Sequence, residues 1–137
     1  MTSLTLAVVL QAAAMTTGAA TYADAHKVAT ETGKPLVVLV GADWCPGCRT
    51  MKNSAIPQVQ QRGGLNKVSF AMVNTDHEHA LAQQLMSGGS IPQLIMYRKT
   101  ADGWQRTSLV GAQSPSQIES FINQGLGTAP ANALGSN

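Results

Sequence analysis

The clearest hydrophobic pattern in the chain is a run of five aliphatic residues at positions 36–40, which lies between Pro35 and Gly41. An unbroken aliphatic run of this length is typical of a central strand that is buried on both faces. Before it, apolar residues recur at helical spacing and predict a helix over residues 22–32, which Gly33 ends. The patterned part of the chain therefore begins with a helix that leads into a buried strand.

The patterns that follow continue the alternation of helices and strands. They predict three helices, which cover residues 45–55, a short stretch that begins at Pro57, and residues 77–86. They also predict strands over residues 68–73, 94–97 and 104–110, and a last helix that is capped by Ser114. Pro57 should push Ile56 out of the α-helical region, so we expect a kink or break there. Turn residues at 101–103 should join the last two strands in an antiparallel hairpin. This order predicts an α/β protein with a central mixed β-sheet flanked by helices on both faces.

At each end of the chain the regular patterning is lost. Residues 1–20 are apolar and uncharged but too short for a membrane span, and we interpret them as a remnant of a signal peptide. Because a positively charged start is missing, three interpretations stay open. The true start codon lies further upstream, or the segment is a weak signal, or it is an extra strand or arm of the folded domain. Residues 125–137 offer little to bury and predict a disordered tail. We therefore expect one folded domain over residues 21–124.

Composition and charge exclude several classes of function. The 137 residues fit one compact domain, and only 12% of them are charged, with a formal net charge of +2. Because lysine and arginine form no cluster, the chain lacks the basic surface of a nucleic-acid-binding protein. Two cysteines are too few for a disulfide-stapled scaffold, and the three histidines lie far from them in sequence, which argues against a zinc site. We therefore look for chemistry at the cysteines themselves, Cys45 and Cys48.

Cys45 and Cys48 lie where the buried strand ends and the next helix begins. Their spacing of three places both sulfur atoms on one side of the first helical turn, close enough for a disulfide. Unpaired N–H groups and the positive end of the helix dipole favour a thiolate there, and Pro46 fits the first helical position. Cys45, nearer the helix end, is then the exposed nucleophile, and Cys48 is the shielded resolving thiol. A C-x-x-C motif in this setting predicts a redox-active dithiol.

Four segments of the chain resemble the thioredoxin-like proteins. They are residues 42–48 with the sequence Ala-Asp-Trp-Cys-Pro-Gly-Cys, residues 73–76, Ser90-Ile91-Pro92 and Val110-Gly111-Ala112. The resemblance implies the thioredoxin fold over about residues 20–124 and a cis Ile91–Pro92 peptide bond that lies against the cysteine pair. It also implies that the main chain of Ile91 pairs with an extended substrate segment. The candidate catalytic residues are Cys45 and Cys48, and the candidate substrate-binding residues are Trp44, Pro46, Gly47, Ile91, Pro92 and Gly111.

Within this family, residues 42–45 and 57–60 look closer to the C-terminal domain of the thiol:disulfide interchange protein DsbD and to related small exported proteins. The Cys-Pro-Gly-Cys order inverts the Gly-Pro of thioredoxin, so the thioredoxin reduction potential does not carry over. Leu39 stands where many members have a buried acid, and Met72 aligns with the lysine that often accompanies it. Deprotonation of Cys48 must then rely on water or on the substrate.

Together these features predict a thiol-disulfide oxidoreductase of the protein-disulfide reductase or thiol:disulfide interchange type. We expect it to need no metal or organic cofactor, to exchange disulfides with protein substrates and an upstream redox partner, and to be a monomer without a stable membrane span. The apolar start and the DsbD-like resemblance favour a periplasmic or secreted location. The alternatives are a redox-silent binding module that presents the groove at Pro92, and a copper(I) carrier that uses Cys45, Cys48 and a methionine.

Overall fold

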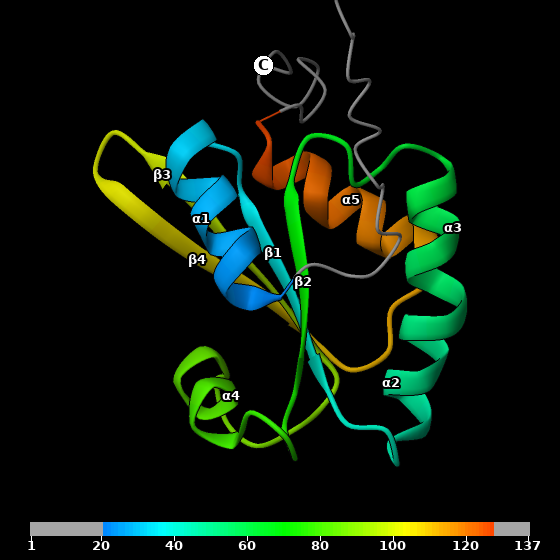
Figure 1. Ribbon diagram of the computed structural model, residues 1–137. Helices are drawn as coiled ribbons and strands as arrows, with labels where there is room; N and C mark the ends of the chain where they lie inside the picture. Colours follow the sequence, from blue (N-terminus) through cyan, green and yellow to red (C-terminus); the bar gives the residue numbers. More distant parts are fainter. Residues whose placement is uncertain (1–20, 128–137) are drawn as a thin grey trace, which may run out of the picture.

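The computed structural model describes residues 21–127, and these residues form a four-stranded mixed sheet with helices on both faces (Figure 1). The strand order is β2-β1-β3-β4, in which β1 runs parallel to β2 and antiparallel to β3, and β4 forms a hairpin with β3. In chain order the elements are α1 (Tyr22–Thr32), β1 (Leu36–Gly41), α2 (Pro46–Thr50), the π-helical segment η1 (Met51–Ala55), α3 (Ile56–Gln61), β2 (Ser69–Asn74), α4 (His79–Leu85), β3 (Gln93–Thr100), β4 (Gly103–Val110) and α5 (Pro115–Gly125). The predicted mixed sheet with helices on both faces is confirmed.

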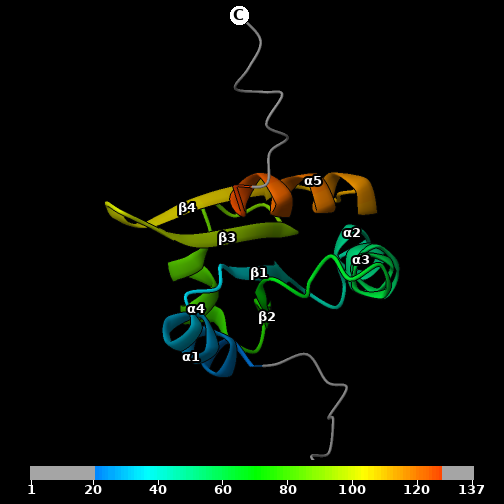
Figure 2. The ribbon, with the colours of Figure 1, turned by 90° about the horizontal axis from the view of Figure 1, so that it is seen from above.

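The helices divide between the two faces of the sheet. Viewed from above, α1 and α4 lie on one side of β1 and β3, while α3 and α5 lie on the other (Figure 2). Strand β1 is buried on both faces because alternate side chains enter different cores: Val37 and Leu39 pack toward α3 and α5, and Val38 and Val40 pack toward α1 and α4. The interpretation of the aliphatic run as a central strand is therefore confirmed.

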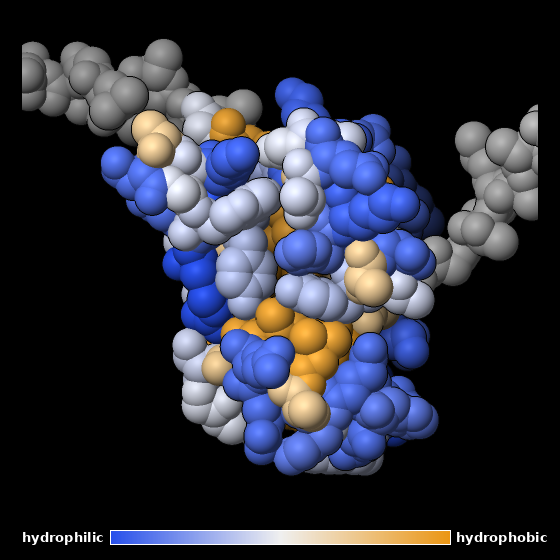
Figure 3. Space-filling model, turned by 60° about the vertical axis from the view of Figure 1, so that its left-hand side comes forward, coloured by the Kyte–Doolittle hydropathy of each residue, from blue (hydrophilic) through white to orange (hydrophobic). Residues whose placement is uncertain are grey.

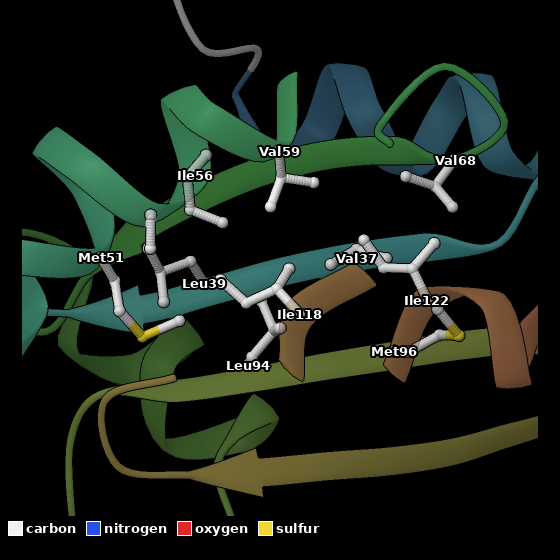
Figure 4. Close-up of a cluster of buried hydrophobic side chains, with 11 residues drawn as sticks. Val37, Leu39, Met51, Ile56, Val59, Val68, Leu94, Met96, Ile118 and Ile122 are labelled. Atoms are coloured by element: carbon white, nitrogen blue, oxygen red, sulfur yellow. The ribbon is translucent and has the colours of Figure 1, made fainter. Parts of the chain in front are cut away.

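The core between the sheet, α3 and α5 is the larger of the two. Figure 4 shows side chains from the π-helical segment, α3, both central strands and α5 pointing toward one another across this space. Its buried members are Val37, Leu39, Met51, Ala55, Ile56, Val59, Val68, Leu94, Met96, Ile118 and Ile122. Each fully buried aliphatic side chain of this size contributes about 1.5–3 kcal/mol, so this core fixes the helix that carries the cysteines against the sheet.

The helix after the cysteines differs from the prediction at Pro57. Ile56 keeps α-helical angles, with φ −63° and ψ −47°, so the expectation that proline would push it out of the α region is wrong. The preceding turn is π-helical instead, and the N–H of Ile56 donates to the carbonyl oxygen of Met51, five residues back. This wider turn relieves the clash between a proline ring and the carbonyl four residues earlier. As a result the chain continues from α2 into α3 without a break (Figure 1).

The surface on the side of α4 is mostly hydrophilic, with one apolar area in a hollow (Figure 3). No helix among residues 21–127 is long and apolar enough to cross a bilayer.

At the C-terminal side α5 extends to Gly125, and Leu126 packs against the core, so the folded domain reaches slightly beyond the predicted boundary at residue 124. The predicted signal-peptide remnant at 1–20 lies outside the described residues, as does most of the predicted tail.

Candidate active site

The two cysteines form a disulfide at the beginning of α2, with their Cα atoms 5.2 Å apart. Cys45 is the N-cap of the helix, and its Sγ accepts a hydrogen bond from the N–H of Cys48 at 3.2 Å. Pro46 follows at the first helical position, where its missing N–H costs nothing. The sequence-based placement of the pair is therefore confirmed, including a helix N–H directed at the sulfur of Cys45. A thiolate formed on Cys45 would be stabilised by this N–H and by the helix dipole.

The predicted contrast in exposure between the two cysteines is not found in the disulfide form. Cys45 is 6% exposed and Cys48 is 5% exposed, so Cys45 is not freely accessible. Both are packed with Ala42, and Ile91 from the loop before β3 covers them. The two sulfur atoms differ in their surroundings, because the Sγ of Cys45 lies near the carbonyl oxygen of Ile91 and the Sγ of Cys48 packs against Gly41 at the end of β1.

Gly41, the last residue of β1, leaves the space that Cys48 occupies. A Cβ atom at this position would lie 2.9 Å from the Sγ of Cys48 and 3.0 Å from its Cβ. Such contacts are shorter than packed atoms tolerate. The sequence pattern marked Gly41 only as the end of a strand, but the structure makes it a part of the active site.

The cis peptide bond that the resemblance implies is present between Ile91 and Pro92. The carbonyl oxygen of Ile91 lies 3.9 Å from the Sγ of Cys45. A Cβ atom on Gly47 would meet Pro92 at 3.4 Å, and the N–H of Gly111 donates to the carbonyl oxygen of Pro92 at 2.8 Å. The structure thus brings these candidate residues together around the disulfide.

Gln93 holds the loop before Pro92 and was not predicted from the sequence. Its side chain is fully buried at 0% exposure and makes three hydrogen bonds. Its Oε1 accepts from the N–H of Ser87 at 3.1 Å, and its Nε2 donates to the carbonyl oxygens of Ser87 and Ser90 at 2.8 and 2.9 Å. A glutamine at the start of an otherwise apolar strand, directly after Ile-Pro, is the sequence signal that could have identified it.

Replacing Gln93 with methionine should loosen this loop while nearly preserving the side-chain volume. Backbone groups of Ser87 and Ser90 would lose their partners, and we expect a loss of about 2–4 kcal/mol in the free energy of unfolding. Urea denaturation measures this loss, and Gln84→Met on the exposed face of α4 should stay within about 0.5 kcal/mol of the parent protein. Equal stability of the two variants would show that the three hydrogen bonds contribute nothing.

Trp44 stands beside the disulfide with its side chain 66% exposed, yet it is held in place. Its Nε1 donates to Oδ2 of Asp76 at 3.0 Å, and the backbone N–H of Asp76 donates to Oδ1 of Asn74 at 2.8 Å. Trp44 and Ile91 form one end of a groove of about 610 Å³ that continues along α4 to Met86. Its other lining residues are Thr75, Asp76, His79, Ala82, Gln83, Gly88 and Gly89. An aromatic and an aliphatic side chain next to the reactive sulfur offer an apolar surface to a docking segment.

A second pocket, of about 220 Å³, lies on the other side of the disulfide and reaches Cys48. Leu39 and Met72, which are paired across β1 and β2, form its apolar wall. These are the two positions where the resemblance leads one to expect an acid and a lysine. The charged groups of this pocket come from elsewhere, namely Asp43, Arg49, Lys52 and Glu78.

Comparison with known proteins places the chain among thioredoxin-like sequences. The family model described as thioredoxin-like matches residues 15–99. The chain is 26% identical over 103 residues to a thioredoxin from Coprinus comatus, a match that covers 75% of this chain and 92% of that protein.

Solved structures show the same fold. A thioredoxin from Thermus thermophilus superposes with a TM-score of 0.66 at 20% identity, covering 82% of this chain and 89% of the other. Trxlp from Edwardsiella tarda is 31% identical, with a TM-score of 0.56 and coverage of 72% of this chain and 91% of the other. The predicted thioredoxin fold is confirmed, and the closer resemblance to DsbD stays a prediction.

Proposed function

The chain belongs to the thioredoxin-like family, and from this premise we propose that it is a thiol-disulfide oxidoreductase that acts on the disulfides of proteins. The observation that carries the proposal is the Cys45–Cys48 disulfide at a helix start, packed against the cis Ile91–Pro92 loop. A purely structural disulfide would not need a groove beside it. Here a groove is lined by Trp44, which precedes Cys45 in the chain, and by Ile91, whose carbonyl oxygen lies 3.9 Å from the Sγ of Cys45.

The exchange begins with the reduced protein. The thiolate of Cys45 attacks one sulfur of a substrate disulfide, and the second substrate sulfur leaves as a thiolate that takes up a proton. Cys48 then gives up its proton and attacks the Sγ of Cys45 in the mixed disulfide. The substrate sulfur that was bonded to Cys45 leaves as a thiolate and is protonated, so the substrate ends with two thiols and the protein with a Cys45–Cys48 disulfide. The reverse sequence oxidises a substrate dithiol.

Protein substrates are supported by the shape of the surface around Cys45. The carbonyl oxygen of Ile91 lies next to the sulfur, where an extended segment could add its own backbone hydrogen bonds. The groove then receives a side chain of that segment between Trp44 and α4. Small thiols would use neither feature.

Reduction of insulin with dithiothreitol as electron source tests the proposed function. We expect catalytic amounts of the protein to accelerate precipitation of the reduced insulin B chain well above the rate with dithiothreitol alone. A rate equal to that background, with a Cys45–Cys48 disulfide that resists reduction by glutathione, would favour the redox-silent binding module instead. Measurement of the reduction potential against glutathione then fixes the direction of electron flow in a given compartment.

The copper(I) carrier makes a different prediction. Met72 lines the same pocket as Cys48, so one thioether lies near the dithiol, and soft sulfur ligands select copper(I). Stoichiometric copper(I) binding that competes with a strong chelator and blocks insulin reduction would replace the proposal. The Met72→Leu variant should leave insulin reduction unchanged if the protein is an oxidoreductase.

The proposal includes a location outside the cytoplasm. It is supported by the uncharged apolar segment at residues 1–20 and by the DsbD-like sequence features around the cysteines. Fractionation of cells that make the natural protein tests it, and recovery only with cytoplasmic markers would contradict it.

A further inference from the structure

The second step of the proposed exchange requires that Cys48 lose a proton, and the following inference rests on that proposed function. Cys48 is 5% exposed, so its thiol does not meet bulk water directly. The surrounding side chains in its cluster, Ala42 and Ile91, cannot accept a proton. The group that accepts this proton must therefore be reached through the pocket beside Cys48.

The pocket beside Cys48 has room for solvent. Its volume of about 220 Å³ exceeds what several water molecules need. Cys48 lines it and Cys45 does not, so water in this pocket serves only the resolving cysteine. Gly41 keeps the path open, because a side chain there would fill the space next to the sulfur.

Among the described residues that line the pocket, the carboxylates belong to Asp43 and Glu78, and these are the side chains that could accept a proton. The other two charged side chains of the pocket, Arg49 and Lys52, are cations and have no lone pair that could accept a proton. Their positive charges at the pocket wall instead favour the thiolate of Cys48 once the proton has left.

Glu78 is an exposed residue at the end of the sheet that backs Cys48, and its carboxylate reaches back over the preceding turn. Its Oε2 accepts from the N–H of Asn74 at 3.4 Å, and its own N–H donates to the carbonyl oxygen of Asn74 at 2.8 Å. Asn74 is the cross-strand partner of Gly41, and the N–H of Thr75 donates to the carbonyl oxygen of Gly41 at 2.9 Å. The turn that holds the Glu78 carboxylate is thus bonded directly to the residue against which Cys48 packs.

The geometry points to Glu78 as the residue that positions and polarises the water that deprotonates Cys48. The thiol proton passes to a pocket water as that water gives a proton to the Glu78 carboxylate. The Cys48 thiolate attacks the Sγ of Cys45, the bond from Cys45 to the substrate sulfur breaks, and the substrate leaves as a thiolate. The Glu78 carboxyl then returns its proton through solvent to that thiolate, so protons and electrons balance.

The test isolates the second step with a small disulfide reagent. Reduced protein reacts with 5,5′-dithiobis(2-nitrobenzoate) first at Cys45, which releases one thionitrobenzoate, and attack by Cys48 then releases the second. We expect Glu78→Gln to slow the second release about tenfold or more at pH 7 without slowing the first. The parent rate should vary little between pH 6 and 8, whereas the variant rate should rise about tenfold per pH unit, as a thiolate fraction does.

Asp43→Asn is the matched control, because it removes the other carboxylate of the pocket. The inference is overturned if Asp43→Asn slows the second release and Glu78→Gln does not. It is also overturned if Glu78→Gln is faster at an unchanged pH slope, since a carboxylate that acts only by its charge raises the pKa of a neighbouring thiol.

Failure of this inference is distinguishable from failure of the proposed function. The reagent needs only Cys45 and Cys48 and no protein substrate. If insulin is not reduced but the second release depends on Glu78, the role of Glu78 stands and the protein-substrate proposal falls. If insulin is reduced and the second release ignores Glu78, the proposed function stands alone.

Discussion

Replacing Cys45 with serine is expected to lower the rate of insulin reduction to that of dithiothreitol alone. Serine keeps the size of the side chain but supplies no thiolate, and an alcohol at the same helix start does not attack a disulfide near neutral pH. The N–H of Cys48 would still find an acceptor in the serine hydroxyl, because serine is a good N-cap. The reduced variant should therefore stay folded, and circular dichroism checks this.

Cys48→Ser should fail in a different way. Cys45 can still attack a substrate disulfide, but nothing resolves the product, so the protein accumulates as a mixed disulfide. Non-reducing electrophoresis should show an adduct with insulin chains that dithiothreitol removes. The Cys45→Ser/Cys48→Ser double variant provides the control and should trap nothing. Adducts of similar yield on Cys45→Ser would reverse the roles that the helix position assigns to the two cysteines.

The fold could be predicted because its most distinctive strand needs no tertiary information. The aliphatic run at 36–40 is apolar at every position, and only a strand with a core on each face can bury all of it. The helix at 22–32 and the capping box of Ser114 and Gln117 likewise depend on neighbours in sequence, and both are present. Local rules were sufficient for these three elements, because the pattern that forms each of them lies within its own stretch of sequence.

Pro57 shows where local rules fail. The restriction that proline places on the preceding residue is a preference, and a π-helical turn removes the clash that causes it. Buried Met51, Ala55 and Ile56 pack into the main core, which stabilises the continuous helix against its local cost. The sequence contains these residues but not the core into which they pack.

The site was predictable in part for the same reason. The cysteines and their helix start are local, whereas the contacts of Ile91 and Pro92 with the disulfide depend on the resemblance. Residues that act only through the folded arrangement were missed, namely Gly41, Gln93, Asp76 and Glu78. Gly41, Gln93 and Asp76 pack or bond to residues on another element or across a loop, which no local pattern records. Glu78 bonds only to Asn74, four residues back, and it is the pairing of Asn74 with Gly41 across β1 and β2 that brings it to the pocket beside Cys48. The near-equal burial of the two cysteines is a further case, because the loop at Ile91 covers both.

Gly41→Ala is expected to destabilise the disulfide relative to the dithiol. The new methyl group would lie 2.9 Å from the Sγ of Cys48, which the disulfide holds in place, whereas a free thiol can turn away. Overpacking of this kind costs about 1–3 kcal/mol. If most of that cost falls on the oxidised form, the reduction potential rises by about 20–65 mV. Equilibration with glutathione at fixed ratios measures the shift.

Gly89 provides a control, because a side chain added there would contact no other residue. A Cβ atom on Gly89 meets nothing within 4 Å, and its backbone does not require glycine, so Gly89→Ala should leave the potential unchanged. If Gly41→Ala also leaves the potential unchanged but lowers the stability of both redox forms equally, the close contact belongs to the Cβ of Cys48 and not to its sulfur. An increase confined to Gly41→Ala would instead show that the end of β1 sets the redox equilibrium of the cysteines through the space it leaves for one sulfur atom.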